Sequence, residues 1–361
     1  MWMWQRLLRH MAAAVMYGLR EPPFTIRRSR CCRICSGISG FRLRPMKLPM
    51  RNGIIIVKKE KGFTSFDVVA KMRGICGQKK IGHTGTLDPD ATGVLPVCLG
   101  KATKICELLA GTDKEYEASL RLGITTDTQD SSGTVTGRFP TEHITPEEVC
   151  KAAEQFRGFT EQIPPMYSAL KVRGKKLYEL ARQGIEIERK PRRIHVSEIA
   201  VTRMCLPELS LRIVCSKGTY IRTICHDLGQ KLSCGAVMTE LQRTRVAGFR
   251  LEQAHTLDEI QDLRDRGDLD TLLIPVDRVF GSVSFCRVRP EWDVILRNGG
   301  KVPEDGIRLE DASDPLQGGA DAFALPSEPD WIRMYLSDGT FVGIYHRAKE
   351  ASVLRPLKMF L

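Results

Sequence analysis

The stretch from Gly82 to Pro96 restricts the fold more than any other part of the sequence, because its glycines and prolines limit the backbone angles. It reads Gly-His-Thr-Gly-Thr-Leu-Asp-Pro-Asp-Ala-Thr-Gly-Val-Leu-Pro. Gly82, Gly85 and Gly93 permit turns or close approaches that residues with a side chain resist, and a proline pushes the preceding residue towards extended angles. That preceding residue is Asp88, so the pattern predicts a loop that presents one carboxylate. An ordinary turn is the alternative, since Asp-Pro and Gly are common in turns.

Apolar periodicity around this loop predicts a domain that contains both strands and helices. A strand is expected where four apolar residues run together, or where apolar and polar residues alternate. A helix is expected where a capping residue precedes apolar residues at helical spacing. The predicted strands cover residues 54–57, 116–122 and 209–215, and the predicted helices begin at Thr64 or Ser65, cover residues 102–110, begin after Thr145, and cover residues 221–232.

Beyond Asp277 the composition shifts to short strand-like pieces joined by turns rich in Gly, Asp and Pro. This change predicts a small C-terminal β domain, with an exposed acidic insertion from Glu304 to Asp330. We therefore expect an extension over residues 1–50, a larger domain over 51–280 and a β domain over 281–361.

The charge is unevenly distributed along the 361 residues. The formal net charge is +12, but the first fifty residues alone carry +9, which leaves +3 for the rest. Any surface for a polyanion must therefore come from local clusters. The two densest comprise Lys171, Arg173, Lys175 and Lys176, and Arg189, Lys190, Arg192 and Arg193. Each could contact phosphates, and each could equally be a solvated surface.

The first fifty residues show no pattern that predicts a core. They resemble a transit peptide in being rich in Arg and poor in acids, while a start codon assigned too far upstream is the alternative, with Met46 or Met50 as the true start. The twelve cysteines are scattered, which favours a reducing compartment, and we expect the cytoplasm. Cys31, Cys32 and Cys35 lack partners at zinc-site spacing, and no segment is apolar for long enough to span a membrane.

Several separated motifs together resemble the TruB-type pseudouridine synthases, in their bacterial form, and they occur in that family's order. The resemblance covers roughly residues 51–361. The motifs are Asn52 to Val69, Gly82 to Lys104, Lys114 to Ala118, Pro164 to Lys171, Cys215 to Thr223, Gly235 to Arg243 and Leu354 to Phe360. The family isomerises a conserved uridine in the TΨC loop of tRNA. The resemblance implies an α/β (α+β) catalytic domain with a mixed, largely antiparallel sheet flanked by helices, followed by a PUA-like RNA-binding domain.

The resemblance also implies roles for three catalytic residues. Asp88 would be the nucleophile, attacking C1′ of the ribose or C6 of the uracil, or it would assist cleavage by abstracting a proton. Arg222 would pair with Asp88 and favour its ionised form. Tyr116 would stack on the base and is a candidate for proton transfer at C5. Without the resemblance, a tyrosine such as Tyr116 is more often a core residue, and an arginine such as Arg222 usually forms an exposed ion pair.

Three further residues match positions that bind the substrate. Tyr220 and Leu241 would pack around the target uracil, and His83 would fill the space left by the everted nucleotide. A lone histidine is otherwise more often structural. One departure is Thr125, where many family members carry arginine, which puts one phosphate or loop contact in doubt.

The isomerisation requires no redox cofactor and no ATP, so we expect no cofactor and no metal. The expected partner is the T-arm stem-loop of tRNA, with no membrane and no obligatory protein partner. Two other interpretations stay open. One is the dyskerin-type branch, which depends on a guide RNA and partner proteins, and the other is an RNA-binding module without turnover.

Overall fold

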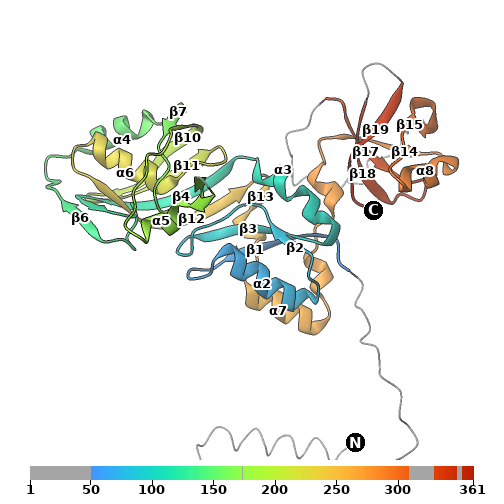
Figure 1. The fold of residues 1–361 in the computed structure, drawn as a ribbon, viewed down its shortest axis with the longest axis horizontal. Helices are drawn as coiled ribbons and strands as arrows, with labels where there is room; N and C mark the ends of the chain where they lie inside the picture. The colour runs from blue at the N-terminus through green and yellow to red at the C-terminus, as the bar shows by residue number, and fades with distance from the viewer. Residues whose placement is uncertain (1–49, 173, 309–328, 348–351) are drawn as a thin grey trace, which may run out of the picture. The chain divides into compact units, whose positions relative to one another are not determined.

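The computed structural model describes residues 50–172, 174–308, 329–347 and 352–361. Two β-sheets dominate these residues (Figure 1), and helices cover the larger sheet. The predicted fold class is confirmed: a large mixed sheet with helices comes first along the chain, and a smaller β-rich part follows it. Most of the N-terminal extension, its cysteine cluster, Arg173 and most of the acidic insertion lie outside the described residues.

The larger sheet is mixed and largely antiparallel. Its strands follow the order β1-β3-β12-β4-β11-β10-β7, with β2 paired to β3 and β13 paired to β12. Only the short pairing of β3 with β12 is parallel among these pairs. The strands are β1 Gly53–Lys59, β2 Ile81–His83, β3 Thr92–Leu99, β4 Lys114–Leu122, β7 Gly158–Gln162, β10 Arg192–Cys205, β11 Glu208–Cys215, β12 Ala236–Val246 and β13 Phe249–Arg250.

The smaller sheet is formed after residue 280. Its order is β15-β19-β18-β17-β14-β16, and its core contains Met334, Tyr345 and Leu354. The elements are β14 Ser284–Val288, α8 Asp293–Arg297, β15 Val302–Pro303, β16 Ile307–Arg308, β17 Trp331–Tyr335, β18 Phe341–Arg347 and β19 Val353–Met359. The β-rich character expected for this region is therefore present, while its PUA-like RNA-binding role stays a prediction.

Two helices begin at capping threonines that the sequence predicted. Thr64 and Thr145 each accept a hydrogen bond from the backbone nitrogen three residues later, and an acid at that third position bonds back, so both are capping boxes. The region 102–110 differs from the prediction, because a 3₁₀-helix precedes a short α-helix there. The remaining elements are α2 Ser65–Cys76, the 3₁₀-helix Gly100–Ile105, α3 Cys106–Ala110, α4 Pro146–Glu154, α5 Leu177–Ala181, α6 Ile221–Lys231, α7 Leu257–Arg266, and the short strands β5 Ile124–Thr126, β6 Val135–Arg138, β8 Lys171–Val172 and β9 Lys175–Lys176.

Two halves of the larger sheet have separate cores. Helices α4 and α6 pack on the half that contains β4, β10 and β11, where Val149 and Leu228 meet Leu211. Helices α2 and α7 cover β1 and β3, where Met72 and Ile260 are buried. The Asp88 loop connects β2 to β3 at the junction of these halves.

Gly93 makes the close approach that joins the two halves. Its φ is +109°, and a Cβ at this position would lie 2.1 Å from the backbone oxygen of Arg243 in β12. Because backbone cannot yield as a flexible side chain does, we expect Gly93→Ala to reduce the free energy of unfolding by about 3 kcal/mol. Urea unfolding followed by circular dichroism measures this loss.

Gly158 provides a matched control, since its φ is +94° and no heavy atom lies within 4 Å of a Cβ built there. Gly158→Ala should reduce the free energy of unfolding only by the conformational cost of a positive φ, about 1–2 kcal/mol. Equal losses at the two positions would contradict a steric role for Gly93.

Candidate functional site

Buried polar contacts hold the loop that carries Asp88 in place. The ammonium of Lys59, which has no exposed surface, donates hydrogen bonds to the carbonyl oxygens of Pro89 at 2.9 Å and Ala91 at 2.5 Å. On the other side of Asp88, the backbone nitrogen of Leu87 donates to the Ser65 hydroxyl at 2.9 Å. The residues that flank Asp88 are therefore held in place while its carboxylate remains outside the packing.

Arg222 connects this carboxylate to a second one. It lies in the first turn of α6, and its two terminal nitrogens reach different partners: Nη2 is 2.6 Å from Asp88 Oδ2, and Nη1 is 3.2 Å from Asp130 Oδ2. The other oxygen of Asp130 accepts hydrogen bonds from Thr128 and Ser132. A planar guanidinium held by two carboxylates has little freedom to turn, so Asp130 orients Arg222 towards Asp88.

The pKa of the Asp88 carboxyl is raised above its usual value because burial removes water from it, while the nearby charge of Arg222 lowers it. Arg222 thus acts in the direction expected from the sequence, but burial outweighs it. The Asp88 side chain is still 44 % exposed, because solvent reaches it through adjoining cavities. A ligand that filled this space would remove that solvent and leave the ion pair as the main stabiliser of the charge.

A cavity of about 350 Å³ lies over the carboxylate. Five of the six predicted site residues line it, namely Asp88, Tyr116, Tyr220, Arg222 and Leu241. A neighbouring cavity of about 460 Å³ shares Asp88, Arg222 and Leu241 and adds Asp130. Residues far apart in the sequence therefore converge on one concave site, with aromatic and aliphatic walls beside an ion pair.

Tyr116 enters this cavity from β4, where alternation places it on the buried face, as predicted. Its hydroxyl interacts with the buried guanidinium of Arg243, and Nε of Arg243 donates to the Val94 carbonyl at 2.8 Å. Burial raises the pKa of Tyr116. The phenol is therefore protonated in the free protein, and its ring forms a wall of the cavity.

Tyr220, the residue that precedes α6, is positioned by the side chain of Gln162 in β7. Its backbone nitrogen donates to Gln162 Oε1 at 2.8 Å, and Gln162 Nε2 donates to its carbonyl oxygen at 3.0 Å. This double contact joins the end of β7 to the start of α6. It therefore also fixes the position of Arg222, in the first turn of that helix.

His83 does not line the cavity that contains Asp88. It ends β2 beside Phe66, with the two rings edge to face at 5.7 Å, and its Nδ1 accepts a hydrogen bond from the Gly85 nitrogen at 3.2 Å. Burial lowers its pKa, which favours the neutral ring. It lines a separate cleft of about 530 Å³ with Phe66, Arg73 and Lys80.

Sequence reasoning missed four charged residues near the cavity: Lys59, Lys114 and Arg243, which are buried, and Asp130, which is partly exposed. Lys114 precedes Tyr116 by two residues on the same strand, so the alternation that placed Tyr116 inward also placed Lys114 there. Burial lowers the pKa of Lys114 to about 8, and its ammonium donates to the carbonyl oxygen of Ala110 at 2.8 Å. No local pattern pointed to Arg243, because its partners come from distant segments.

Thr125 is buried between β6 and the start of β12. Its hydroxyl is 3.0 Å from that of Thr136, and a Cβ built on Gly235 would lie 2.6 Å from its methyl group. The threonine is thus a packing residue in this chain and does not present a group to phosphates.

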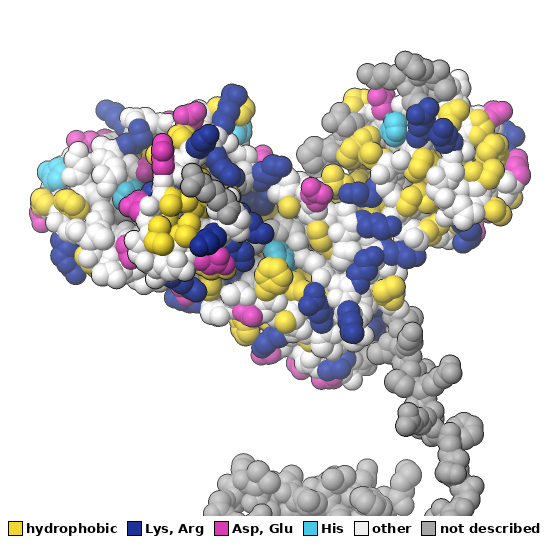
Figure 2. All heavy atoms as spheres, in the orientation of Figure 1, with side chains coloured by type: hydrophobic (Ala, Val, Ile, Leu, Met, Phe, Trp, Pro, Cys, Tyr) yellow, Lys and Arg dark blue, Asp and Glu magenta, His cyan; other side chains and the backbone are white. Residues whose placement is uncertain are grey.

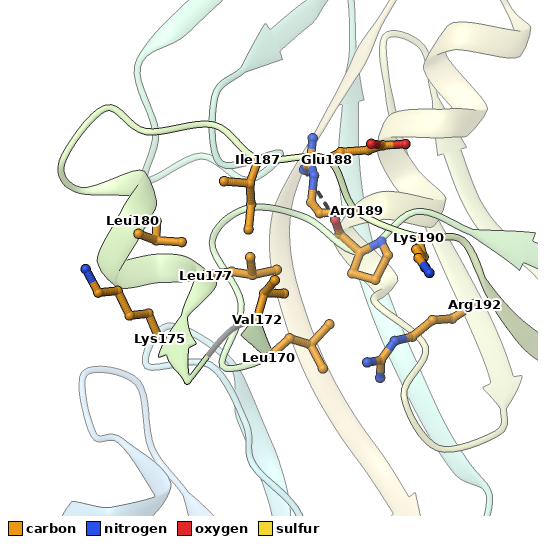
Figure 3. A pocket seen from close by; sticks show the side chains of 11 residues that line it. Leu170, Val172, Lys175, Leu177, Leu180, Ile187, Glu188, Arg189, Lys190 and Arg192 are labelled. Atoms are coloured by element: carbon orange, nitrogen blue, oxygen red, sulfur yellow. Dashed lines mark hydrogen bonds between the residues drawn. The ribbon is translucent and has the colours of Figure 1, made fainter.

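The two basic clusters predicted from the sequence border one cavity of about 820 Å³. Figure 3 shows Lys175 on one side of it and Arg189, Lys190 and Arg192 on the other, with apolar side chains such as Val172, Leu177 and Ile187 between them. Arg189 is partly neutralised, since it donates to Glu186 at 2.8 Å and to the Pro164 carbonyl at 3.3 Å. Lys and Arg side chains also gather over the region of α3 and β2 (Figure 2).

Within the described residues, no group of three or more His, Cys, Asp or Glu side chains could hold a metal ion. Among the helices of those residues, none is long and apolar enough to cross a membrane.

Comparison with solved structures identifies the class of fold. The Cbf5-Nop10-Gar1 complex contains a chain with a TM-score of 0.61 and 23% identity, covering 86% of this chain and 85% of that one. A chain of the archaeal box H/ACA sRNP Nop10-Cbf5 complex gives a TM-score of 0.60 at 23% identity, covering 88% and 89%. At this identity the likeness concerns the fold alone.

Sequence comparison identifies the family. The family model for the TruB family pseudouridylate synthase N-terminal domain matches residues 73–221, and that for the tRNA pseudouridylate synthase B C-terminal domain matches residues 222–280. tRNA pseudouridine synthase B of Lachnoclostridium phytofermentans is 48% identical over 86% of this chain and 100% of its own length. Its counterpart from Bacillus pumilus is 41% identical over 86% and 98%. The chain belongs to the TruB family of pseudouridylate synthases.

Proposed function

We propose that this chain is the isomerase that converts the conserved uridine at position 55, in the TΨC loop of tRNA, to pseudouridine in the cytoplasm. The family makes it an enzyme that forms pseudouridine in tRNA. The observation that best supports the finer proposal is the pairing of Asp88 with Arg222 at 2.6 Å inside a cavity walled by Tyr116 and Tyr220.

The isomerisation breaks the bond from N1 to the ribose and rejoins the ring through C5, which loses its proton while N1 gains one. Asp88 supplies the nucleophile or the base for this exchange, and Arg222 keeps it ionised once substrate has displaced water. The direction of attack, at C1′ or at C6, is left open.

The uracil must leave its stack to reach this carboxylate, because the cavity is concave and the loop lies at its floor. Tyr116 and Tyr220 provide aromatic surfaces and Leu241 an aliphatic one, which suits the flat faces of a base. For His83, which lines a separate cleft, the proposed role is to fill the space that the everted nucleotide leaves. Its neutral ring suits stacking rather than charge pairing.

The decisive experiment is the release of tritium from tRNA transcribed with uridine labelled at C5. We expect release from wild-type tRNA and from a bare T-arm stem-loop, and none from a transcript in which cytidine replaces uridine 55. Release from the stem-loop without other components would also exclude dependence on a guide RNA. Equal release from the cytidine transcript would contradict the proposed position.

RNA binding should weaken as salt rises, because Lys and Arg side chains at the 820 Å³ cavity would contact phosphates and release counterions. Each lost phosphate contact should reduce the slope of log affinity against log salt by about 0.7–0.9. Lys190→Gln is expected to reduce the slope by about one contact, whereas Lys151→Gln, on the exposed side of α4, should leave it unchanged. Filter binding between low and moderate salt measures both slopes. A salt-independent affinity would be evidence against phosphate contacts.

A further inference from the structure

Two cysteines lie close together on one face of β2, the strand that ends at His83. Cys98 lies in β3 with no exposed surface, and Cys106 is the first residue of α3. Cys106 packs against the buried cluster that contains Cys98, and each thiol shifts the pKa of the other. Both are free thiols, and neither has a part in the site around Asp88.

The geometry of β2 explains why the two thiols face the same space. Gly82 pairs directly with Cys98 across the β2–β3 ladder, so their Cα–Cβ directions share one face of the sheet. A Cβ built at Gly82 would lie 3.3 Å from the sulfur of Cys106. The Cys106 sulfur therefore occupies the face towards which Cys98 points, in the space left by the absent side chain of Gly82.

The two thiols differ in access and in charge. Cys106 is half-buried and lines the 530 Å³ cleft together with Arg73, Lys79 and Lys80, whereas Cys98 is closed to solvent. A cation near a thiol favours its thiolate, and the charge of Lys358 acts on Cys106 in this direction. The interaction with Cys98 lowers the pKa of Cys106, while the same interaction and burial raise the pKa of Cys98. Cys106 is thus suited to react with a solute, and Cys98 is suited to react afterwards with the modified Cys106.

We propose that Cys98 and Cys106 form an oxidisable dithiol, in which Cys106 reacts with hydrogen peroxide and Cys98 completes a disulfide. The Cys106 thiolate attacks one peroxide oxygen, the O–O bond breaks, and hydroxide leaves, which gives a sulfenic acid. The Cys98 sulfur then attacks the sulfenyl sulfur, its proton accompanies the departing hydroxyl, and water is released as the S–S bond forms. Peroxide accepts the two electrons that the thiols lose. Such a bond would be transient in a reducing compartment.

The test is peptide mapping of the full chain, reduced, desalted and then titrated with hydrogen peroxide. Lys101 and Lys104 lie between the two cysteines, so trypsin separates them, and linked peptides arise only from the disulfide. We expect this link at peroxide concentrations about tenfold lower than those that oxidise the exposed Cys150 or Cys205. Dithiothreitol should remove it. Absence of the link in the wild-type chain, while Cys150 is oxidised, would overturn the proposal.

Single variants separate the two roles. Cys98→Ser should leave Cys106 as a sulfenic acid that dimedone traps, and Cys106→Ser should leave Cys98 unmodified under the same conditions. Cys150→Ser is the matched control and should form the link as the wild type does. If the Cys98→Ser and wild-type chains yielded the same amount of dimedone adduct on Cys106, Cys98 would not be the resolving thiol. Circular dichroism of each variant verifies folding.

Discussion

Replacement of Asp88 by asparagine should abolish isomerisation, with kcat/KM reduced by at least about 10⁴-fold. Asparagine has nearly the same shape and still fits between its neighbours, but it is neither a nucleophile nor a base of useful strength. Tritium release from labelled tRNA measures the loss. The effect should lie in kcat, since the missing group acts on the reacting atoms and contributes little to holding the RNA.

RNA binding by Asp88→Asn should stay near the wild-type level or become slightly tighter, because a negative charge has been removed from a site that receives a polyanion. Asp90→Asn is the matched control: the same chemical change, two residues along the same loop, at an exposed side chain outside the ion pair with Arg222. It should retain kcat/KM within a few-fold. Substantial turnover by Asp88→Asn, or an equal loss in Asp90→Asn, would refute the role given to Asp88.

The sequence predicted those elements whose signals are local. Thr64 and Thr145 begin helices because their capping boxes lie within four residues, and the alternation from Tyr116 onwards defined the buried face of β4. Asp88 was found for the same reason, since the proline that follows it and the surrounding glycines shape its loop directly. The pairing with Arg222 was expected only from the family resemblance.

The contacts that complete the site could not be predicted in this way. Lys59 supports the Asp88 loop from a strand about thirty residues earlier, and Arg243 reaches Tyr116 and Val94 from a strand far along the chain. Such contacts depend on sheet order, and the parallel pairing of β3 with β12 has no local signal. The balance of burial and charge at Asp88 likewise depends on three-dimensional packing, so only the contribution of Arg222 was expected, and that from the family resemblance.

Arg222→Lys should reduce kcat/KM by about 10²-fold or more. The planar guanidinium holds Asp88 and Asp130 simultaneously through two nitrogens, and a single ammonium cannot do so. Asp130→Asn tests the same arrangement from the other side and should have a smaller effect, since the contact between Arg222 and Asp88 survives. Arg212→Lys is the control, because Arg212 pairs with Glu115 and Glu198 outside the cavity. Its activity should be close to that of the wild type.

The pH profile distinguishes this role from a merely structural one. Activity needs ionised Asp88, so it falls as pH decreases through the pKa of that group. Burial raises this pKa and Arg222 lowers it. When the guanidinium is replaced, the lowering contribution weakens, the pKa rises further, and the acidic limb of kcat/KM should move to higher pH. Arg222→Gln, which removes the charge, should move the limb further than Arg222→Lys. If both variants lost activity with an unmoved acidic limb, Arg222 would act only on structure, and the ion pair would not determine the ionisation of Asp88.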